Sequence, residues 1–136
     1  MKAKDGDTVK KMILLLVAVM LLTACGQDKE NDREATYMNI TAEKAKQIMD
    51  MEEGYIILDV RTQEEYDEGH IPGAILIPNT EIEDRAEDEM TDKNQLILVY
   101  CRSGRRSKLA AEILVELGYT NIREFGGIID WPYEVE

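Results

Sequence analysis

The sequence predicts an α/β domain with a mostly parallel central sheet and helices on both faces, and three observations lead to this class. Residues 96–100 are a short, continuous apolar run, and residues 55–60 are a similar run interrupted by Asp59. Both are typical of strands that are covered on both faces of a parallel sheet. Segments with apolar residues at helical spacing alternate with these runs, which is the pattern of an α/β fold. The chain has 136 residues, enough for one domain with an adequate core. We assign residues 37–136 to that domain.

The first third of the domain is predicted to be strand, helix and strand. Residues 37–40 form a short strand, and Thr41 is a good N-cap for a helix that starts at Ala42. Gly54 ends the connection after this helix, and the strand at residues 55–60 follows. The apolar face of the helix consists of Ala45, Ile48 and Met49.

The middle of the domain is predicted to consist of short elements. Thr62 and Glu65 have the spacing of a capping box, so a helix of barely two turns starts here and ends at Gly69. A Pro-Gly turn follows, and residues 74–77 form a third short strand. Residues 79–94 are strongly acidic and are predicted to form a short helix and a solvated loop. The buried positions of this acidic segment are expected to be Ile82 and Met90.

The last third of the domain is built around the strand at residues 96–100. A helix from Ser107 follows it, and Gly118 ends this helix. A last strand is expected at residues 122–125, with Gly126–Gly127 as a turn. The apolar positions are Leu109, Ala110, Ile113, Leu114 and Leu117 in the helix, and Ile128, Ile129 and Trp131 in a short terminal helix.

The loop between that strand and that helix carries the residues best suited to chemistry. A strand that enters a helix through a tight loop directs backbone N–H groups and the positive end of the helix at one point. Cys101 opens this loop, so its pKa should be depressed and its thiol should ionise near neutral pH. Gly104 lets the backbone approach the sulfur or adopt a positive φ. The other loop residues are Arg102, Ser103, Arg105, Arg106 and Ser107, whose arginines offer donors to an anionic substrate.

Three motifs in this order resemble the rhodanese (sulfurtransferase) family. The loop CRSGRRS after a buried strand is similar to the family's active-site loop, and IILDVRTQEEYDEGHIPGAILIP at residues 56–78 is similar to its N-terminal signature. A strand followed by Gly-Gly and then Trp131 resembles its C-terminal pattern. The resemblance covers residues 38–132. It implies a three-layer fold in which helices cover both faces of a mostly parallel sheet.

The resemblance also implies a reaction. The Cys101 thiolate would attack the outer sulfur of a small anionic donor such as thiosulfate, carry that sulfur as a persulfide, and deliver it to a thiol or cyanide acceptor. Residues 102–107 would bind the substrate, and no metal or organic cofactor is required. Asp59 and Arg61 lie near the same sheet edge and are candidates for a supporting role, but the alternative that they bond each other or loop backbone is favoured.

Four alternatives stay open at this point. Cys101 could be a core cysteine surrounded by solvated arginines. The domain could be a catalytically weak, membrane-tethered binding or regulatory module on a rhodanese-like fold. It could instead be a persulfide relay that serves a protein thiol. Phosphatase or arsenate reductase activity is disfavoured, because similar cysteine phosphatases place five residues between Cys and Arg, and here only four separate Cys101 from Arg106.

His70 and the net charge limit the remaining possibilities. The lone histidine is expected to bond backbone in a structural turn rather than to pair with the cysteine, and one His with one Cys cannot close a zinc site. The formal net charge of -12 argues against nucleic acid as a partner, since a phosphate backbone needs a basic face. An acidic body with a local cationic pocket suits a small anion. We expect a monomer.

The N-terminal segment is predicted to be a targeting signal. Residues 1–24 contain the adjacent basic residues Lys10 and Lys11, followed by a ten-residue apolar stretch that is too short to span a bilayer. The sequence Leu22-Thr23-Ala24-Cys25 resembles a bacterial lipobox, in which the cysteine is lipidated. Residues 25–36 would then be the lipidated cysteine and a flexible polar tether. We expect an exported protein, anchored by lipid to a bacterial membrane, with its domain outside the cytoplasm.

Overall fold

The computed structural model describes residues 36–136. The predicted signal peptide, the lipidation at Cys25 and residues 26–35 of the tether lie outside the described residues. Among residues 36–136, no helix is long and apolar enough to cross a membrane.

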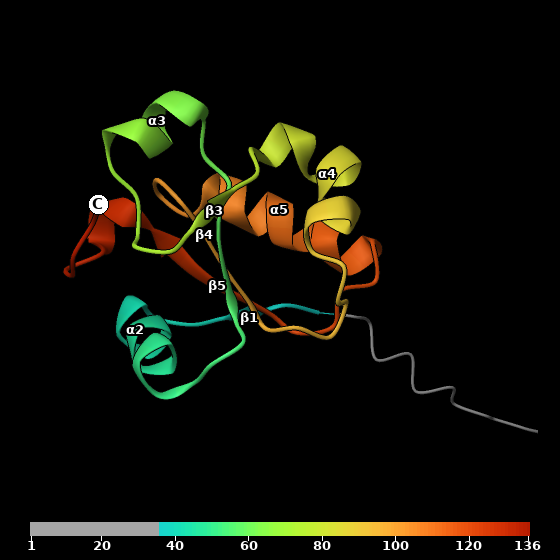
Figure 1. Ribbon diagram of the computed structural model, residues 1–136, viewed down its shortest axis with the longest axis horizontal. Helices are drawn as coiled ribbons and strands as arrows, with labels where there is room; N and C mark the ends of the chain where they lie inside the picture. Colours follow the sequence, from blue (N-terminus) through green and yellow to red (C-terminus); the bar gives the residue numbers. More distant parts are fainter. Residues whose placement is uncertain (1–35) are drawn as a thin grey trace, which may run out of the picture. The chain divides into compact units, whose positions relative to one another are not determined.

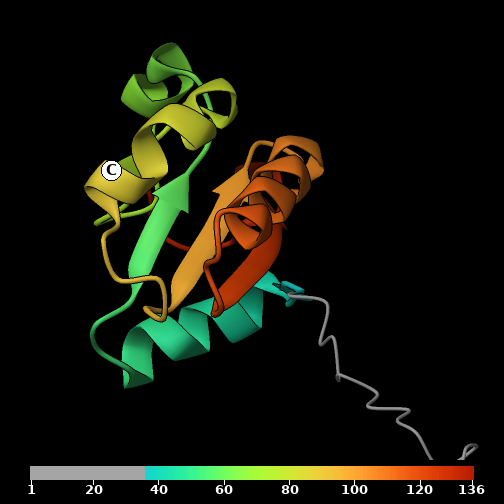
Figure 2. The same cartoon turned by 90° about the vertical axis from the view of Figure 1, so that its right-hand side faces the viewer.

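The described part of the chain is organised around a five-stranded sheet in the order β1-β5-β4-β2-β3. All four neighbouring pairs run parallel, which confirms the predicted α/β class. Parallel neighbours place the carboxyl ends of the strands at one edge, and Figure 2 shows β2 and β4 pointing toward the side where α3 lies. The strands are β1 (Met38–Asn39), β2 (Ile56–Asp59), β3 (Ile75–Leu76), β4 (Ile97–Cys101) and β5 (Ile122–Gly127).

Helices cover both faces of the sheet, as predicted (Figure 1). One face packs against α2, and the other packs against α4 and α5 (Figure 2). The helices are α2 (Ala42–Met51), α3 (Gln63–Glu68), α4 (Ile82–Glu89) and α5 (Arg105–Glu116), with 3-10 turns η1 (Asn79–Glu81) and η2 (Ile128–Asp130).

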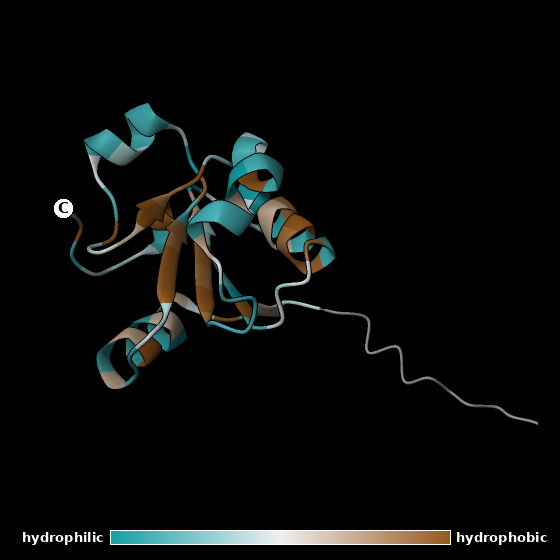
Figure 3. Ribbon diagram, turned by 45° about the vertical axis from the view of Figure 1, so that its right-hand side comes forward, coloured by the Kyte–Doolittle hydropathy of each residue, from teal (hydrophilic) through white to brown (hydrophobic). Residues whose placement is uncertain are grey.

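Each face of the sheet has its own apolar cluster. β4 separates them, because its five residues are all buried and alternate between the two faces. Val99 and Cys101 belong to the cluster under α4 and α5, whereas Leu98 and Tyr100 belong to the one under α2. Figure 3 shows this pattern as apolar strands between helices that are polar on their outer sides. The predicted points of burial in the acidic segment, Ile82 and Met90, are both inside.

The helix ends follow the sequence signals closely. The Thr41 side chain accepts a hydrogen bond from the Lys44 N–H, and the capping box between Thr62 and Glu65 is complete. The C-terminus of α5 is a Schellman motif, in which Gly118 N–H donates to the Val115 carbonyl and the next residue bonds that of Leu114. The predicted ends of these helices are thus explained by local hydrogen bonds.

Several predicted details are wrong. Helix α5 begins at Arg105, two residues earlier than expected, because Gly104 turns the chain directly into it. Leu109 is 47% exposed, since Ala110 and Leu114 take the side of α5 that faces the sheet. Ile129 is 62% exposed on the terminal turn. Gly126–Gly127 continues β5 instead of leaving it, because Gly127 pairs with Cys101.

Candidate active site

Cys101 is the last residue of β4, in the centre of the sheet. Its side chain is buried, with 1% of the residue exposed, and it is a free thiol. The residue also lies where the β4–β5 register shifts, because Val99 pairs with Glu124 whereas Cys101 pairs with Gly127. This bulge brings the end of β5 beside the loop that follows Cys101.

The loop surrounds the sulfur with hydrogen-bond donors. Gly104 N–H lies 3.0 Å from Cys101 Sγ, and Ser107 Oγ lies 3.4 Å from it. Burial raises the pKa of the thiol, but hydrogen bonds from the Ser107 side chain and from the N–H groups of Ser107, Gly104 and Ser103 outweigh burial. The pKa of Cys101 is therefore lowered from its ordinary value. This agrees with the direction that the strand-loop-helix pattern predicts.

Two glycines permit this close packing of the loop. Gly104 has φ +100°, the left-handed region, and it directs its N–H at the sulfur. Gly127 is required because no side chain fits at this position: a Cβ there would lie 1.9 Å from the Arg102 carbonyl oxygen. The end of β5, where a turn was predicted, thus touches the backbone of the cysteine loop.

Ser107 links the cysteine to a buried carboxylate. Ser107 is fully buried, and its Oγ donates to Glu124 Oε1 at 2.6 Å. Glu124 is 2% exposed and also accepts from Gly126 N–H at 2.8 Å. Within residues 36–136, Glu124 makes no ion pair. Glu124 was not assigned to the site from the sequence alone. Its position could have indicated burial, because it follows the core residue Ile122 by two positions and so lies on the same face of the strand.

The three loop arginines have different partners. Arg106 is held by Glu65 of α3, with two hydrogen bonds of 2.7 and 2.8 Å between guanidinium and carboxylate. The bonds from Arg106 lower the pKa of Glu65 to about 2. Arg102 and Arg105 are exposed and form no ion pair with the part of the chain that is described. Arg106 therefore orders the loop against α3, and Arg102 and Arg105 are the arginines with guanidinium groups available to an anion.

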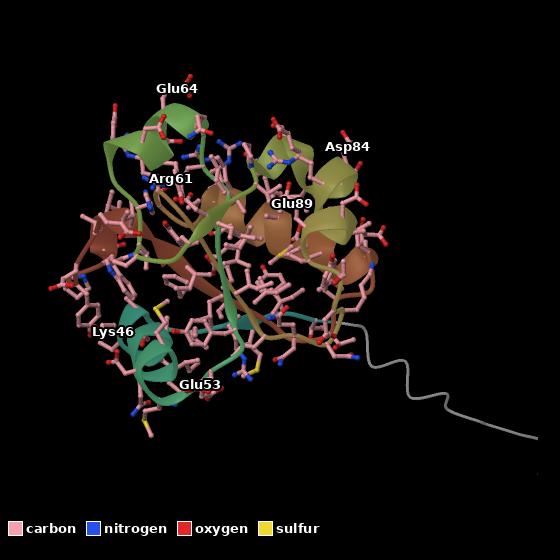
Figure 4. The ribbon with its side chains drawn as sticks, in the orientation of Figure 1. Lys46, Glu53, Arg61, Glu64, Asp84 and Glu89 are labelled. Carbon is pink, nitrogen blue, oxygen red and sulfur yellow. The ribbon has the colours of Figure 1, made fainter. Side chains whose placement is uncertain are left out.

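Asp59 and Arg61 form a separate buried cluster at the end of β2. Arg61 Nη2 donates to Asp59 Oδ2 at 2.7 Å and to the Gly69 carbonyl at 2.7 Å. Tyr100 donates its hydroxyl hydrogen to Asp59 Oδ2 at 2.7 Å and accepts from Ile71 N–H. Figure 4 shows Arg61 close to α3. These contacts match the alternative in which the two side chains bond each other and loop backbone.

His70 lies in the turn after α3 and bonds backbone, as expected. Its Nδ1 lies 2.9 Å from the Tyr66 carbonyl oxygen, and its ring stacks on that of Tyr66 at 3.7 Å. Its Nε2 lies 3.4 Å from Glu136 Oε1. The hydrogen-bond partners of the Cys101 sulfur come instead from the loop and α5.

These features define a class of protein. A parallel α/β sheet presents a buried cysteine at a strand end, inside a ring of backbone donors at the start of a helix. Such a site suits a cysteine nucleophile that carries a small group. The family comparison agrees: the rhodanese-like domain matches residues 41–132, and the chain belongs to that family.

Two relatives of known name share substantial sequence with the chain. It is 45% identical over 73 residues to the thiosulfate sulfurtransferase PspE of Escherichia coli strain K12, covering 54% of this chain and 70% of that protein. It is 37% identical over 112 residues to the putative sulfur carrier protein YrkF of Bacillus subtilis strain 168, covering 82% of this chain and 60% of the relative. These relatives support sulfur transfer in general.

Solved structures support the same fold. A rhodanese with anions from E. coli superposes with a TM-score of 0.57 at 40% identity, covering 60% of this chain and 96% of that one. A rhodanese-like domain protein from Staphylococcus aureus gives 0.62 at 32% identity, covering 73% of this chain and 96% of that one. The predicted rhodanese fold is therefore confirmed.

Proposed function

We propose that the protein is a rhodanese-type sulfurtransferase that carries a sulfane sulfur on Cys101, with thiosulfate as a donor. The observation that carries this proposal is the buried Cys101 sulfur with Gly104 N–H at 3.0 Å. Its lowered pKa favours the thiolate, and the same donors can stabilise the negative charge of a terminal persulfide sulfur.

The reaction proceeds in two displacements. The Cys101 thiolate attacks the outer sulfur of thiosulfate, a new S–S bond forms, and the S–S bond of the donor breaks. Its electron pair leaves with sulfite, and the protein holds a persulfide anion. An acceptor such as cyanide or a thiolate then attacks the outer sulfur and restores the Cys101 thiolate. No electron is gained from or lost to a third reagent, so residues of the chain suffice.

The three loop arginines have different roles in substrate binding. Arg102 and Arg105 are exposed at the loop and can bind the sulfonate oxygens of the donor through their fixed donor geometry. Arg106 keeps the loop in place through Glu65 and adds positive charge near the sulfur. Ser103 and Ser107 contribute N–H groups to the ring around the sulfur.

A thiosulfate–cyanide assay tests this proposal. We expect the full chain with Cys25→Ser, whose only thiol is Cys101, to produce thiocyanate with the parallel-line kinetics of a double displacement. The matched control adds Cys101→Ser and should produce none. Equal rates for the two proteins would overturn the proposal.

We further propose that lipid on Cys25 anchors the protein to a bacterial membrane, with the domain outside the cytoplasm. The support is the lipobox-like sequence that ends at Cys25. Expression of the full chain in a bacterium should place it in the membrane fraction, and Cys25→Ala should release it. Membrane association that survives this substitution would contradict lipid anchoring.

A further inference from the structure

A buried carboxylate next to the cysteine has no part in the reaction above. Glu124 is 2% exposed and forms no ion pair among residues 36–136. Burying a charge without a partner is costly, so such a group calls for an explanation. Its contacts are the Ser107 hydroxyl at 2.6 Å and Gly126 N–H at 2.8 Å.

The hydrogen bonds at this site form a directed chain. The Cys101 thiol donates to Ser107 Oγ at 3.4 Å, and the Ser107 hydroxyl donates to Glu124 Oε1 at 2.6 Å. The hydroxyl has one hydrogen, for which the carbonyls of Gly104 and Gly126, at 3.0 and 3.4 Å, also compete. Ser107 can donate to a Cys101 thiolate only when its hydrogen is not given to Glu124. A proton on Glu124 satisfies this condition, because the carboxyl group then becomes the donor.

We propose that Glu124 takes the proton of Cys101 through the Ser107 hydroxyl, so that the thiolate forms without a proton leaving the buried site. The S–H bond breaks and its hydrogen joins Ser107 Oγ, while the original hydroxyl hydrogen passes to Glu124 Oε1. The electron pair stays on sulfur, and the negative charge moves from the carboxylate to the thiolate. Ser107 touches the reacting atom, and Glu124 is a positioning residue that acts through it. The inference rests on the proposed role of Cys101 in sulfur transfer.

The surroundings favour the negative charge at the sulfur. The sulfur accepts from Gly104 N–H at the start of α5, and Arg106 interacts electrostatically with it. The carboxylate has one backbone N–H and the shared hydroxyl. The charged and titratable groups around the pair are Arg102, Arg105 and Arg106 in the loop and α5, Glu65 of α3, Glu112 of α5, and Tyr37 before β1.

The pH dependence of Cys101 alkylation tests this exchange, with the full chain carrying Cys25→Ser. Two groups that share one proton titrate in two steps, so the rate of the parent protein should follow a two-step pH profile with a flat region between the steps. Glu124→Gln leaves a single titrating thiol, whose rate should follow one step without a flat region and fall about tenfold per pH unit below its midpoint. Ser107→Ala should give the same steep fall. Glu116→Gln, which removes an exposed carboxylate of α5, should keep the flat region.

A second measurement does not depend on the stability of these variants. At a pH within the flat region, infrared spectra of the parent protein should contain a band from a protonated carboxylic acid, which Cys101→Ser removes because no thiol gives up its proton. A parent protein that titrates in one step, or that lacks this band, would overturn the proposal. Sulfur loading is measured separately. If Cys101 is loaded with sulfur but its alkylation lacks the two-step pH profile, only the proton exchange is rejected. If the two-step profile is present but no sulfur is loaded, only sulfur transfer is rejected.

Discussion

Two buried polar clusters lie at the ends of neighbouring strands, and they differ in how their charge is balanced. At the end of β2, Asp59 is bonded to the Arg61 guanidinium and the Tyr100 hydroxyl, so the carboxylate is paired. At the end of β4, the Cys101 thiol is linked through Ser107 to the Glu124 carboxylate of β5, which has no cationic partner among the described residues. We call Asp59, Arg61 and Tyr100 the frame, because this paired cluster stabilises the fold. We call Glu124, Ser107 and Cys101 the reactive cluster, because its unpaired carboxylate is free to exchange a proton.

The largest difference in stability between the two clusters is expected when the carboxylate of each one is removed. Asp59→Ala leaves the Arg61 charge 95% buried without its partner, which should cost about 3–5 kcal/mol in the free energy of unfolding. Urea unfolding followed by circular dichroism measures this loss. The exposed Asp88→Ala should change stability by less than about 0.5 kcal/mol.

Glu124→Gln should behave differently, because the amide can still accept from Ser107 and Gly126. We expect it to cost about 1 kcal/mol or less and to act mainly on the titration of Cys101. Similar losses for Asp59→Ala and Glu124→Gln would remove the distinction between the frame and the reactive cluster.

The contact between β5 and the cysteine loop gives the next largest effect. In Gly127→Ala the new Cβ would meet the Arg102 carbonyl, so loop and strand must separate at a cost of about 3 kcal/mol, with loss of sulfur transfer. Thermal unfolding and the thiocyanate assay measure both effects. Gly54→Ala has the strain of a positive φ but open space around its Cβ, so it should cost only about 1–2 kcal/mol and leave activity intact.

The Tyr100 hydroxyl tests whether the frame influences the neighbouring thiol. Tyr100→Phe removes the hydroxyl that bonds Asp59 and the Ile71 N–H, which should cost about 1–3 kcal/mol. The rate of Cys101 alkylation should stay within about twofold of the parent rate, because the tyrosine points to the α2 face and the cysteine to the other. A large change in alkylation would show that the clusters are coupled.

The smallest effect concerns the pair between Glu65 and Arg106. Because the folded pKa of Glu65 is about 2 and its ordinary value is 4.5, this pair adds stability above about pH 4.5 and loses it as pH falls toward 2. Glu65→Gln keeps the capping box, so at about pH 7 it should cost only about 1 kcal/mol for a partly exposed pair. The difference in urea midpoint between the two proteins should shrink at acid pH. A difference independent of pH would contradict this account.

Much of the fold and the centre of the site could be predicted from local sequence. The apolar runs identified β2 and β4, and Thr41, Thr62 and Gly118 marked helix ends through local hydrogen bonds. Cys101 and Gly104 stood out because a strand-loop-helix unit places its donors within a few residues.

What sequence reasoning missed depends on contacts between distant segments. Glu124 meets Ser107 across 17 positions, and Glu65 meets Arg106 across 41. Gly127 looked like a turn because the sequence gives no sign that the Arg102 carbonyl lies against it. Such contacts follow from the strand order, which the local pattern does not determine.

The intact mass of the full chain with Cys25→Ser, after incubation with thiosulfate, tests the central claim most directly. We predict a gain of one sulfur atom that cyanide removes and that the added Cys101→Ser change abolishes. An unchanged mass, in a protein whose Cys101 still reacts with an alkylating agent, would contradict the account, because a reactive thiol would then be present without carrying sulfur.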